Sequence, residues 1–311
     1  MYIVPLLVCL FFFSSCTLKH SRIEPQFSPT VQDSYVKSLA SSFPPLSEEE
    51  KQTPWGIEFV IGQKFARDLD LYQAITAFKR SDILIPSELS HRKKELFYNI
   101  VLSYYLGQKY QDLIYFYEKS KMADHLIDLN IWEDFLTILY DSYSKVGDKG
   151  QTKRFIDYLN QNHPHLAQKL HLHHSIEMAD LTDLTTLSKA SVPLQQALHS
   201  YQIHKKSPFK AKSLNALLPG AGYLYLGQKQ SALTAFLLNG AFIAAAYQFY
   251  HKGYIAAGVI TTSFEAGWYF GGILGAEIET KVYNERVYES CFYPFMYQEK
   301  VFPILQLKYG F

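Results

Sequence analysis

The chain has 311 residues, which is long enough for two domains, and its 30 Lys and Arg nearly cancel its 29 Asp and Glu. Because this balance leaves no global basic field, the composition argues against nucleic acid as a partner. Three cysteines, Cys9, Cys16 and Cys291, are too few for a disulfide framework.

The N-terminus begins with an apolar run over residues 3–13, followed by Ser14, Ser15 and Cys16 and then by polar sequence. The run is too short to span a bilayer but matches the apolar region of a secretory signal. Ser14-Ser15-Cys16 resembles a bacterial lipobox, which implies a signal peptide over residues 1–15, a lipid on Cys16 and a location in the bacterial cell envelope. Another cleaved signal and an uncleaved anchor are the open alternatives.

Residues 16–54 are rich in Pro, Ser and Glu. Pro25, Pro29, Pro44 and Pro45 interrupt any long helix, although residues 33–43 have room for a short one. The stretch predicts a flexible tether between the membrane and the domain that follows.

Residues 55–203 show the periodicity of paired helices. Apolar residues recur at i, i+3, i+4 and i+7 along residues 96–106 and 131–146, with short turns containing glycine between helices. Ala74, Leu113 and Thr152 hold equivalent positions at an even step of 39 residues (113 − 74 and 152 − 113). The +4 and +12 positions are Phe78 and Pro86 in the first unit and Ile156 and Pro164 in the third.

This spacing resembles tetratricopeptide-type repeats over roughly a third of the chain. The resemblance implies a TPR-like helical solenoid, whose concave face in such proteins usually binds a peptide or a partner protein. A helical spacer that only separates two membrane-linked ends is the alternative.

Five histidines fall within residues 163–174: His163, His165, His171, His173 and His174. His171 and His174 are i, i+3 and can share one face of a helix, where imidazoles can ligate zinc or nickel. Because no Cys and no HExxH pattern supports a metal site, we expect exposed or half-buried histidines and no cofactor. No nucleophile–base spacing or phosphate loop predicts an enzyme.

A basic stretch, residues 204–213, precedes the most apolar part of the chain. Its four lysines and Phe209 predict a linker at the membrane surface, attracted to anionic headgroups. The stretch that follows is similar to the Pro-Gly-x-Gly-x-x-Tyr-x-Gly opening of bacterial two-span membrane hairpins, which implies topology rather than activity. The residues that carry this match are Pro219, Gly220, Gly222, Tyr225 and Gly227. Since proline ends a helix and glycine permits turns, we expect a short interfacial or re-entrant helix here.

Two apolar runs, residues 232–250 and 254–276, predict a two-helix transmembrane hairpin within residues 214–280, because a spanning helix needs about 20 apolar residues. Small residues let helices approach closely in lipid. They are Gly240 in the first run and Gly267, Gly271 and Gly275 in the second. These faces close the hairpin or join copies into a homo-oligomer.

Asn239 and Glu265 are the polar residues deep in these runs, each 13 positions from Lys252 (252 − 239 and 265 − 252). In an antiparallel hairpin they fall at similar depth, where a hydrogen bond is expected. A carboxylate inside a membrane is costly, so its presence there favours a functional role. The pair therefore has a structural role, or the chain is an accessory subunit of a membrane transport or assembly complex and uses the pair within the bilayer.

The charged residues do not decide on which side of the membrane the repeats lie. A secretory N-terminus places the repeats outside the cytoplasm, whereas the lysines of residues 204–213 favour the cytoplasmic side. Residues 281–311 predict a polar extension of the second helix and a terminal strand or packing tail. The sequence thus predicts a mainly α, non-enzymatic envelope protein that is held in the lipid bilayer and binds a protein partner through its repeats.

Overall fold

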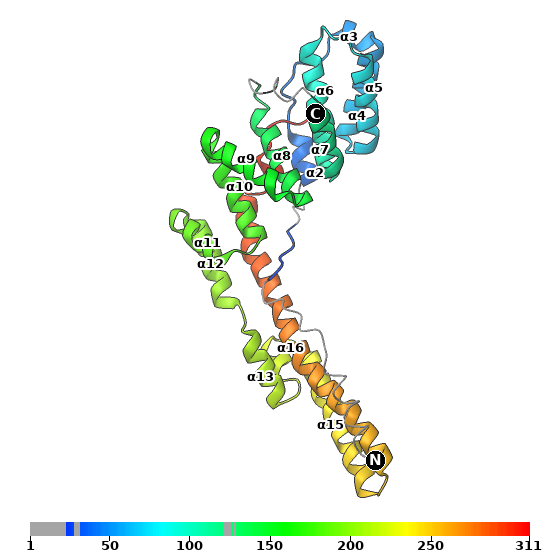
Figure 1. The fold of residues 1–311 in the computed structure, drawn as a ribbon, viewed down its shortest axis with the longest axis vertical. Helices are drawn as coiled ribbons and strands as arrows, with labels where there is room; N and C mark the ends of the chain where they lie inside the picture. Colours follow the sequence, from blue (N-terminus) through cyan, green and yellow to red (C-terminus); the bar gives the residue numbers. More distant parts are fainter. Residues whose placement is uncertain (1–22, 28–31, 121–125, 127–128) are drawn as a thin grey trace. The chain divides into compact units, whose positions relative to one another are not determined.

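In a computed structural model of the chain, the residues described are 23–27, 32–120, 126 and 129–311. The signal peptide and Cys16 lie outside them, so lipidation stays a prediction. The described residues are mainly α-helical and contain no β-strand, which confirms the mainly α class (Figure 1). Two compact units are present. We call Gln26–Leu198 with Phe292–Phe311 the multihelical unit, and Met1–Pro25 with His199–Cys291 the apolar unit.

The multihelical unit contains, in chain order, α2 Gln32–Ser38, α3 Glu48–Gln52, α4 Pro54–Arg67, α5 Leu71–Leu84, α6 Ser90–Leu106, α7 Tyr110–Lys119, α8 Trp132–Val146, α9 Lys149–Asn162, α10 Pro164–Glu177, α11 Leu181–Leu187 and the 3-10 turn η2 Ser188–Ala190. From α3 onwards, consecutive helices of the multihelical unit are separated by five residues or fewer, except α7 and α8. The starts of α5, α7 and α9 repeat the step of 39 residues found in the sequence (110 − 71 and 149 − 110). The unit also contains α17, Pro303–Gln306, and the first part of α12, Val192–His204.

One kind of turn precedes α5, α7, α9 and α11. Each begins with a residue of positive φ: Leu69 (62°), Gln108 (55°), Gly147 (82°) and Ala179 (47°). The N–H of the next residue donates to the carbonyl five residues earlier, as from Asp70 to Phe65 at 2.9 Å. This bond pairs a carbonyl in the last turn of the preceding helix, which has no partner within that helix. Three of the four positions are not glycine, so their turn conformation is hidden in the sequence.

The interface between paired helices is filled by small and aromatic side chains. Ala74 and Phe78 of α5 are fully buried, and a methyl group on Gly62 of α4 would lie 2.6 Å from the Phe78 ring. Leu113 is also fully buried at the equivalent position of α7. Thr152 of α9 is half-buried, and its hydroxyl donates to the Asp148 carbonyl at 2.7 Å. The third pair therefore depends less on this position for its packing.

The prediction of a flexible tether over residues 16–54 is wrong for its second half. α2 and α3 fold within the multihelical unit, where Val36 and Leu46 are only 4% and 6% exposed. Arg92 of α6 donates to the carbonyls of Pro44 (2.6 Å) and Pro45 (3.1 Å). Proline cannot donate a backbone hydrogen bond, but its carbonyl still accepts one, and a buried arginine uses this to order the segment.

The multihelical unit is also discontinuous, unlike the domain predicted over residues 55–203. α16 extends over Ile255–Gln298, which confirms the polar helical extension, and residues 301–311 (the tail) pack in the multihelical unit. Buried apolar side chains of the tail are Val301, Phe302, Ile304, Leu305, Leu307 and Phe311. The tail contains the single-turn helix α17 rather than a strand.

The apolar unit consists of α13 Pro208–Leu217, α14 Ala221–Tyr225, α15 Lys229–His251 and most of α16. The linker predicted over residues 204–213 is therefore largely the first half of α13. α15 and α16 lie side by side (Figure 1), and the Tyr250 and Thr262 hydroxyls are 3.2 Å apart near their connection.

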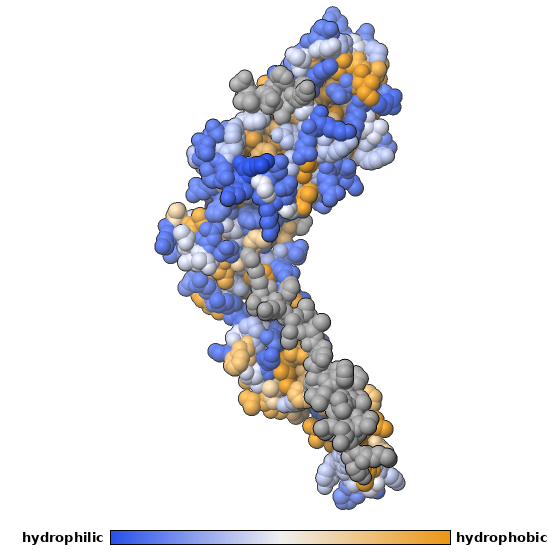
Figure 2. Space-filling view, viewed as in Figure 1, coloured by the Kyte–Doolittle hydropathy of each residue, from blue (hydrophilic) through white to orange (hydrophobic). Residues whose placement is uncertain are grey.

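Within the described ranges, α15 is the one helix long and apolar enough to cross a membrane, and few of its residues are buried inside the molecule. The apolar half of α16 does not reach the same apolarity, because Thr261, Thr262, Ser263 and Glu265 interrupt it. Figure 2 shows apolar side chains at the surface of this unit. Of the two spans expected from the sequence, length and composition therefore support the first, and the second stays a prediction.

Candidate functional site

The Pro-Gly motif forms a tight corner between α13, α14 and α15. Gly220 has φ 91°, and its N–H donates to Asn215 Oδ1 at 2.9 Å, as does the Gly222 N–H at 3.3 Å. A side chain on Gly220 would overlap the Ala232 carbonyl of α15, and one on Gly222 would overlap the Ala211 carbonyl of α13. The motif therefore serves close backbone packing. Asn215, only 2% exposed, organises it and was missed in the sequence.

Of the other residues of the motif, Tyr225 contacts the basic stretch. The Tyr225 hydroxyl accepts from the Ser207 N–H at 3.2 Å, and Lys206 Nζ lies 4.9 Å from the Tyr225 ring centroid. Gly227 has φ 83° and no atom within 4 Å of an added Cβ, so glycine is needed there for its backbone conformation rather than for space. Pro219 precedes the left-handed Gly220 after α13 has ended at Leu217.

Polar contacts fasten this corner to α16 within the apolar unit. The Asn284 side chain bonds both the N–H (2.7 Å) and the carbonyl (2.9 Å) of Lys206. Lys212 pairs with Glu277 at 2.8 Å, and the Tyr269 hydroxyl donates to the Ala216 carbonyl. α13 and the residue Lys206 before it are thus held along α16 between Tyr269 and Asn284.

The glycine faces were expected to close the hairpin or to join copies, and three of the four glycines do not pack against a described part of the chain. Among the described residues, Gly240, Gly267 and Gly271 have nothing within 4 Å of an added Cβ, so joining of copies through these faces stays a prediction. Gly275 does face a packed neighbour, because its added Cβ would overlap the Tyr223 hydroxyl of α14. The i, i+4 spacing places these residues on one face but does not say which neighbour that face meets.

Asn239 and Glu265 are both buried, at 4% and 9% exposed, in an otherwise outward-facing pair of helices. Asn239 Nδ2 donates to the Ala235 carbonyl at 2.6 Å, within its own helix. Asn239 Oδ1 and Glu265 Oε2 have no hydrogen-bond partner in the part of the chain that the structure describes. The expected bond between the two side chains is therefore not formed, and two buried acceptor atoms remain unsatisfied.

The histidine cluster divides between surface and core. His171 lies 3.4 Å from Asp183, while the neighbouring His173 is buried, 3.7 Å from the Glu177 carboxylate. Burial is the main cause that lowers the pKa of His173, which favours the neutral ring. In the described part of the chain no three His, Cys, Asp or Glu side chains are grouped as a metal site, and His171 and His174 gain no further ligand.

The tail is held by side chains that bind its main chain, which the sequence did not predict. Asp134 Oδ2 of α8 accepts from the N–H groups of Lys308 (2.8 Å) and Tyr309 (2.9 Å). The Tyr98 hydroxyl of α6 donates to the Tyr309 carbonyl at 3.1 Å. From α2, the Tyr35 hydroxyl donates to the carbonyls of residues 305 (3.0 Å) and 307 (2.7 Å).

The end of the tail reaches the first helix pair. The Gly310 N–H donates to the Ala40 carbonyl at 3.0 Å, and a side chain on Gly310 would lie 3.0 Å from Leu39. The Phe311 ring is 6% exposed and stacks on Phe78 of α5, with centroids 6.4 Å apart. We call the residues that hold the tail, Tyr35, Ala40, Phe78, Tyr98 and Asp134, the tail site.

The tail site combines burial with charge. Burial raises the pKa of Asp134 to about 6, although the N–H groups of Tyr309 and Lys308 oppose the rise by stabilising the carboxylate. Lys308 pairs with Glu133 at 2.6 Å, and this bond is the main cause that lowers the pKa of Glu133. The acidic start of α8 thus binds both the backbone and a side chain of the tail.

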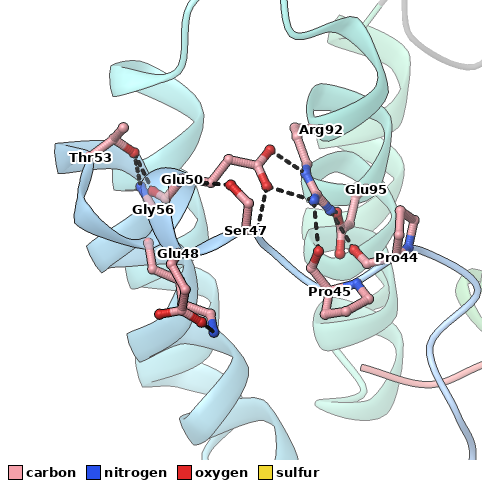
Figure 3. A network of polar contacts seen from close by, with 10 residues as sticks. Pro44, Pro45, Ser47, Glu48, Glu50, Thr53, Gly56, Arg92 and Glu95 are labelled. Carbon is pink, nitrogen blue, oxygen red and sulfur yellow. Dashed lines mark hydrogen bonds and ion pairs between the residues drawn. The ribbon is translucent and has the colours of Figure 1, made fainter.

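A buried arginine near the start of α6, Arg92, anchors the N-terminal segment (Figure 3). Arg92 Nε and Nη2 donate to the two Glu50 oxygens at 2.9 and 2.8 Å, and Nη1 donates to Glu95 Oε2 at 2.7 Å. Glu95 is 1% exposed, and burial raises its pKa to about 7 against the opposing hydrogen bond from Arg92. The network explains how α3 is attached and has no group placed for chemistry.

A scan against protein-family models and searches of curated proteins and of solved structures found no match to this chain. The assignment of function therefore rests on the geometry of the two units alone.

Proposed function

We propose that the chain is a non-enzymatic, membrane-anchored protein of the bacterial cell envelope, whose multihelical unit is a TPR-like solenoid that binds a protein partner. α15 and the apolar half of α16 form its two-span hairpin. The observation that carries the proposal is the outward apolar surface of α15, on which Leu233, Phe236, Leu237 and Ile243 are 51–60% exposed. Water disfavours so large an apolar patch, whereas the acyl chains of a bilayer cover it.

The polar interruption of α16 is compatible with lipid because its hydroxyl groups bond within the helix. Thr261, Thr262 and Ser263 each donate to the carbonyl four residues earlier at 2.9 Å. A hydroxyl satisfied in this way costs less in hydrocarbon than an unsatisfied one. The large side chains Ile260, Phe264 and Trp268 of the same half are 51–68% exposed, as in α15.

The N-terminus and the basic corner supply two further contacts with the membrane in this proposal. Lipidation at Cys16 would place a second anchor at the same bilayer, which strengthens attachment beyond a single acyl chain. Phe209 is 77% exposed beside Lys210, a pairing suited to an anionic lipid surface. A secretory start places the multihelical unit outside the cytoplasm.

Alkaline extraction of membranes tests the anchor. We expect the wild-type chain to stay in the membrane pellet, and Leu237→Lys with Ile243→Lys to move it towards the soluble or aggregated fraction. Each lysine near the centre of a span costs about 2.5–3.5 kcal/mol. The matched control is Tyr72→Lys on α5, which is 80% exposed and outside the apolar unit. Release of the wild-type chain by alkali would contradict the proposal.

Partner binding is supported by the tail site, since the multihelical unit already holds one extended segment through main-chain hydrogen bonds. Affinity capture from detergent-solubilised cells provides the test. We expect a partner whose recovery depends on residues 55–166. A protein that remains membrane-bound and folded but captures no such partner acts as a spacer instead.

The second candidate is an accessory subunit of a membrane transport or assembly complex that uses Asn239 and Glu265. Its supporting observation is that both side chains are buried and each keeps an unsatisfied oxygen. Glu265→Gln preserves the shape of the side chain but removes its charge and its proton. Loss of the cellular phenotype with normal insertion would favour this candidate, whereas an unchanged phenotype and assembly would leave a structural role. Glu299→Gln, at an exposed carboxylate, is the control.

A further inference from the structure

The tail resembles a bound peptide more than a core element. Its backbone groups at residues 305, 307, 308, 309 and 310 are recognised by Tyr35, Asp134, Tyr98 and the Ala40 carbonyl, and its last aromatic ring stacks on Phe78. In peptide-recognition sites, main-chain bonds of this kind supply affinity and side-chain pockets supply specificity. The elements that contribute, α2, α5, α6 and α8, come from most of the length of the multihelical unit (Figure 1).

We propose that the tail site is a peptide-recognition site that the chain occupies in cis, and that the partner binds there through an extended aromatic-Gly-Phe segment like residues 309–311. The inference rests on the proposed function, because it names the surface and the chemistry of that partner. Binding is then an exchange, in which the segment of the partner replaces the tail.

Because the tail site is buried, we expect the partner segment to replace the tail directly rather than to bind after the tail has left the site empty. Tyr98 is fully buried and Asp134 is 1% exposed, so an emptied site would leave polar groups without their hydrogen bonds in a poorly solvated place. A cavity of about 510 Å³ adjoins the tail, and its lining includes Leu39, Thr137, His165 and residues 305–308. A second segment has room to enter here before the tail leaves.

A ligand tethered in cis acts at an effective concentration in the millimolar range. A free peptide therefore competes poorly with the intact tail, and weakening the tail exposes the affinity of the site. Phe311→Ala removes the ring that stacks on Phe78 without changing a residue of the tail site.

The probe is a fluorescein-labelled synthetic peptide with the sequence of residues 299–311, added to the full chain in detergent micelles and followed by fluorescence anisotropy. We expect the Phe311→Ala chain to bind it at least tenfold more tightly than the wild type does. Asp134→Ala in the same chain should abolish the gain, and a peptide with alanine in place of its own Phe311 should not bind.

Native emission of Trp55, which is 3% exposed, verifies the fold of each variant. If Phe311→Ala loses that emission, Phe311→Leu takes its place and the same comparison decides. The proposal is overturned if the folded, tail-weakened chain does not bind the peptide, or binds it equally with and without Asp134. Because alkaline extraction measures the anchor separately, failure here leaves the membrane proposal intact and removes only the exchange site.

Discussion

Asp134 joins three segments of the multihelical unit through a single carboxylate. It lies on α8, accepts two N–H groups from the tail, and is 3.4 Å from the Tyr98 hydroxyl of α6. Burial outweighs these hydrogen bonds and raises its pKa from 3.8 to about 6. The folded chain therefore holds this proton more tightly than the unfolded chain does.

This shift predicts a dependence of stability on pH. Since the folded pKa of Asp134 is raised, its contribution is fully present below pH 3.8 and is lost as pH rises through about 6. The full loss corresponds to about 3 kcal/mol. We expect unfolding of Asp134→Asn, followed by tryptophan emission between pH 4 and 7, to show a smaller fall in stability than the wild type. The exposed control Asp157→Asn should keep the wild-type slope, and an equal slope in Asp134→Asn would contradict the assignment.

The backbone conformation of the Pro-Gly motif depends on Gly220. Its φ of 91° and its approach to the Ala232 carbonyl leave no room for a side chain. We expect Gly220→Ala to lower the stability of the apolar unit by about 2 kcal/mol or more, from backbone strain and overlap. Gly240→Ala, at a helical glycine with nothing within 4 Å, should change it by less than about 1 kcal/mol. Equal thermal unfolding of the two variants in detergent would show that the motif is not packed as described.

At the scale of elements, α6 organises the first half of the multihelical unit. Arg92 attaches the segment containing Pro44, Pro45 and Glu50 to one end of this helix (Figure 3). Tyr98 contacts the tail further along the helix. The N-terminal segment and the tail, distant in sequence, are therefore both held by residues of α6.

Removal of Arg92 should release the N-terminal segment. Arg92→Ala leaves Glu95 buried without its cation, and breaking a buried pair in this way costs about 3–5 kcal/mol. We expect a lower melting temperature and new proteolytic cleavage within residues 41–52. Adding Glu95→Gln should recover part of the stability, because the amide carries no charge. A double variant no more stable than Arg92→Ala would argue against a cost from the unpaired carboxylate.

The periodicity of apolar residues predicted the helices of this unit well, because the residues that form one face of a helix are close together in the sequence. The step of 39 residues between Ala74, Leu113 and Thr152 reappears in the starts of α5, α7 and α9. Whether these helices form tetratricopeptide-type repeats stays a prediction. The turns at Leu69, Gln108 and Ala179 were hidden because tertiary packing holds ordinary residues in a conformation that usually indicates glycine.

Contacts between distant segments could not be predicted in the same way. Nothing near residue 308 indicates that Asp134 accepts its N–H, and nothing near Pro44 indicates Arg92, because each contact depends on the folded path of the chain. In the apolar unit, spacing alone aligned Gly240, Gly267 and Gly271 on faces that meet no neighbour among the described residues. Asn215 was identified only from its bonds to Gly220 and Gly222.

For the whole molecule, we propose that the apolar unit lies in a bilayer and that the multihelical unit lies outside it. Tryptophans report on both parts: Trp268 lies in the apolar half of α16 and is 51% exposed, whereas Trp55 and Trp132 belong to α4 and α8. A side chain that faces lipid contacts acyl chains directly, and bromine on those chains quenches its emission.

The most direct test is the tryptophan emission of the full chain reconstituted in vesicles with brominated acyl chains, beside Trp268→Phe in the same vesicles. We expect the bromine to quench the wild-type emission, Trp268→Phe to remove nearly all of this quenching, and soluble acrylamide to reach Trp268 poorly. Equal quenching of both chains, or a Trp268 that acrylamide quenches and bromine does not, would contradict the anchor.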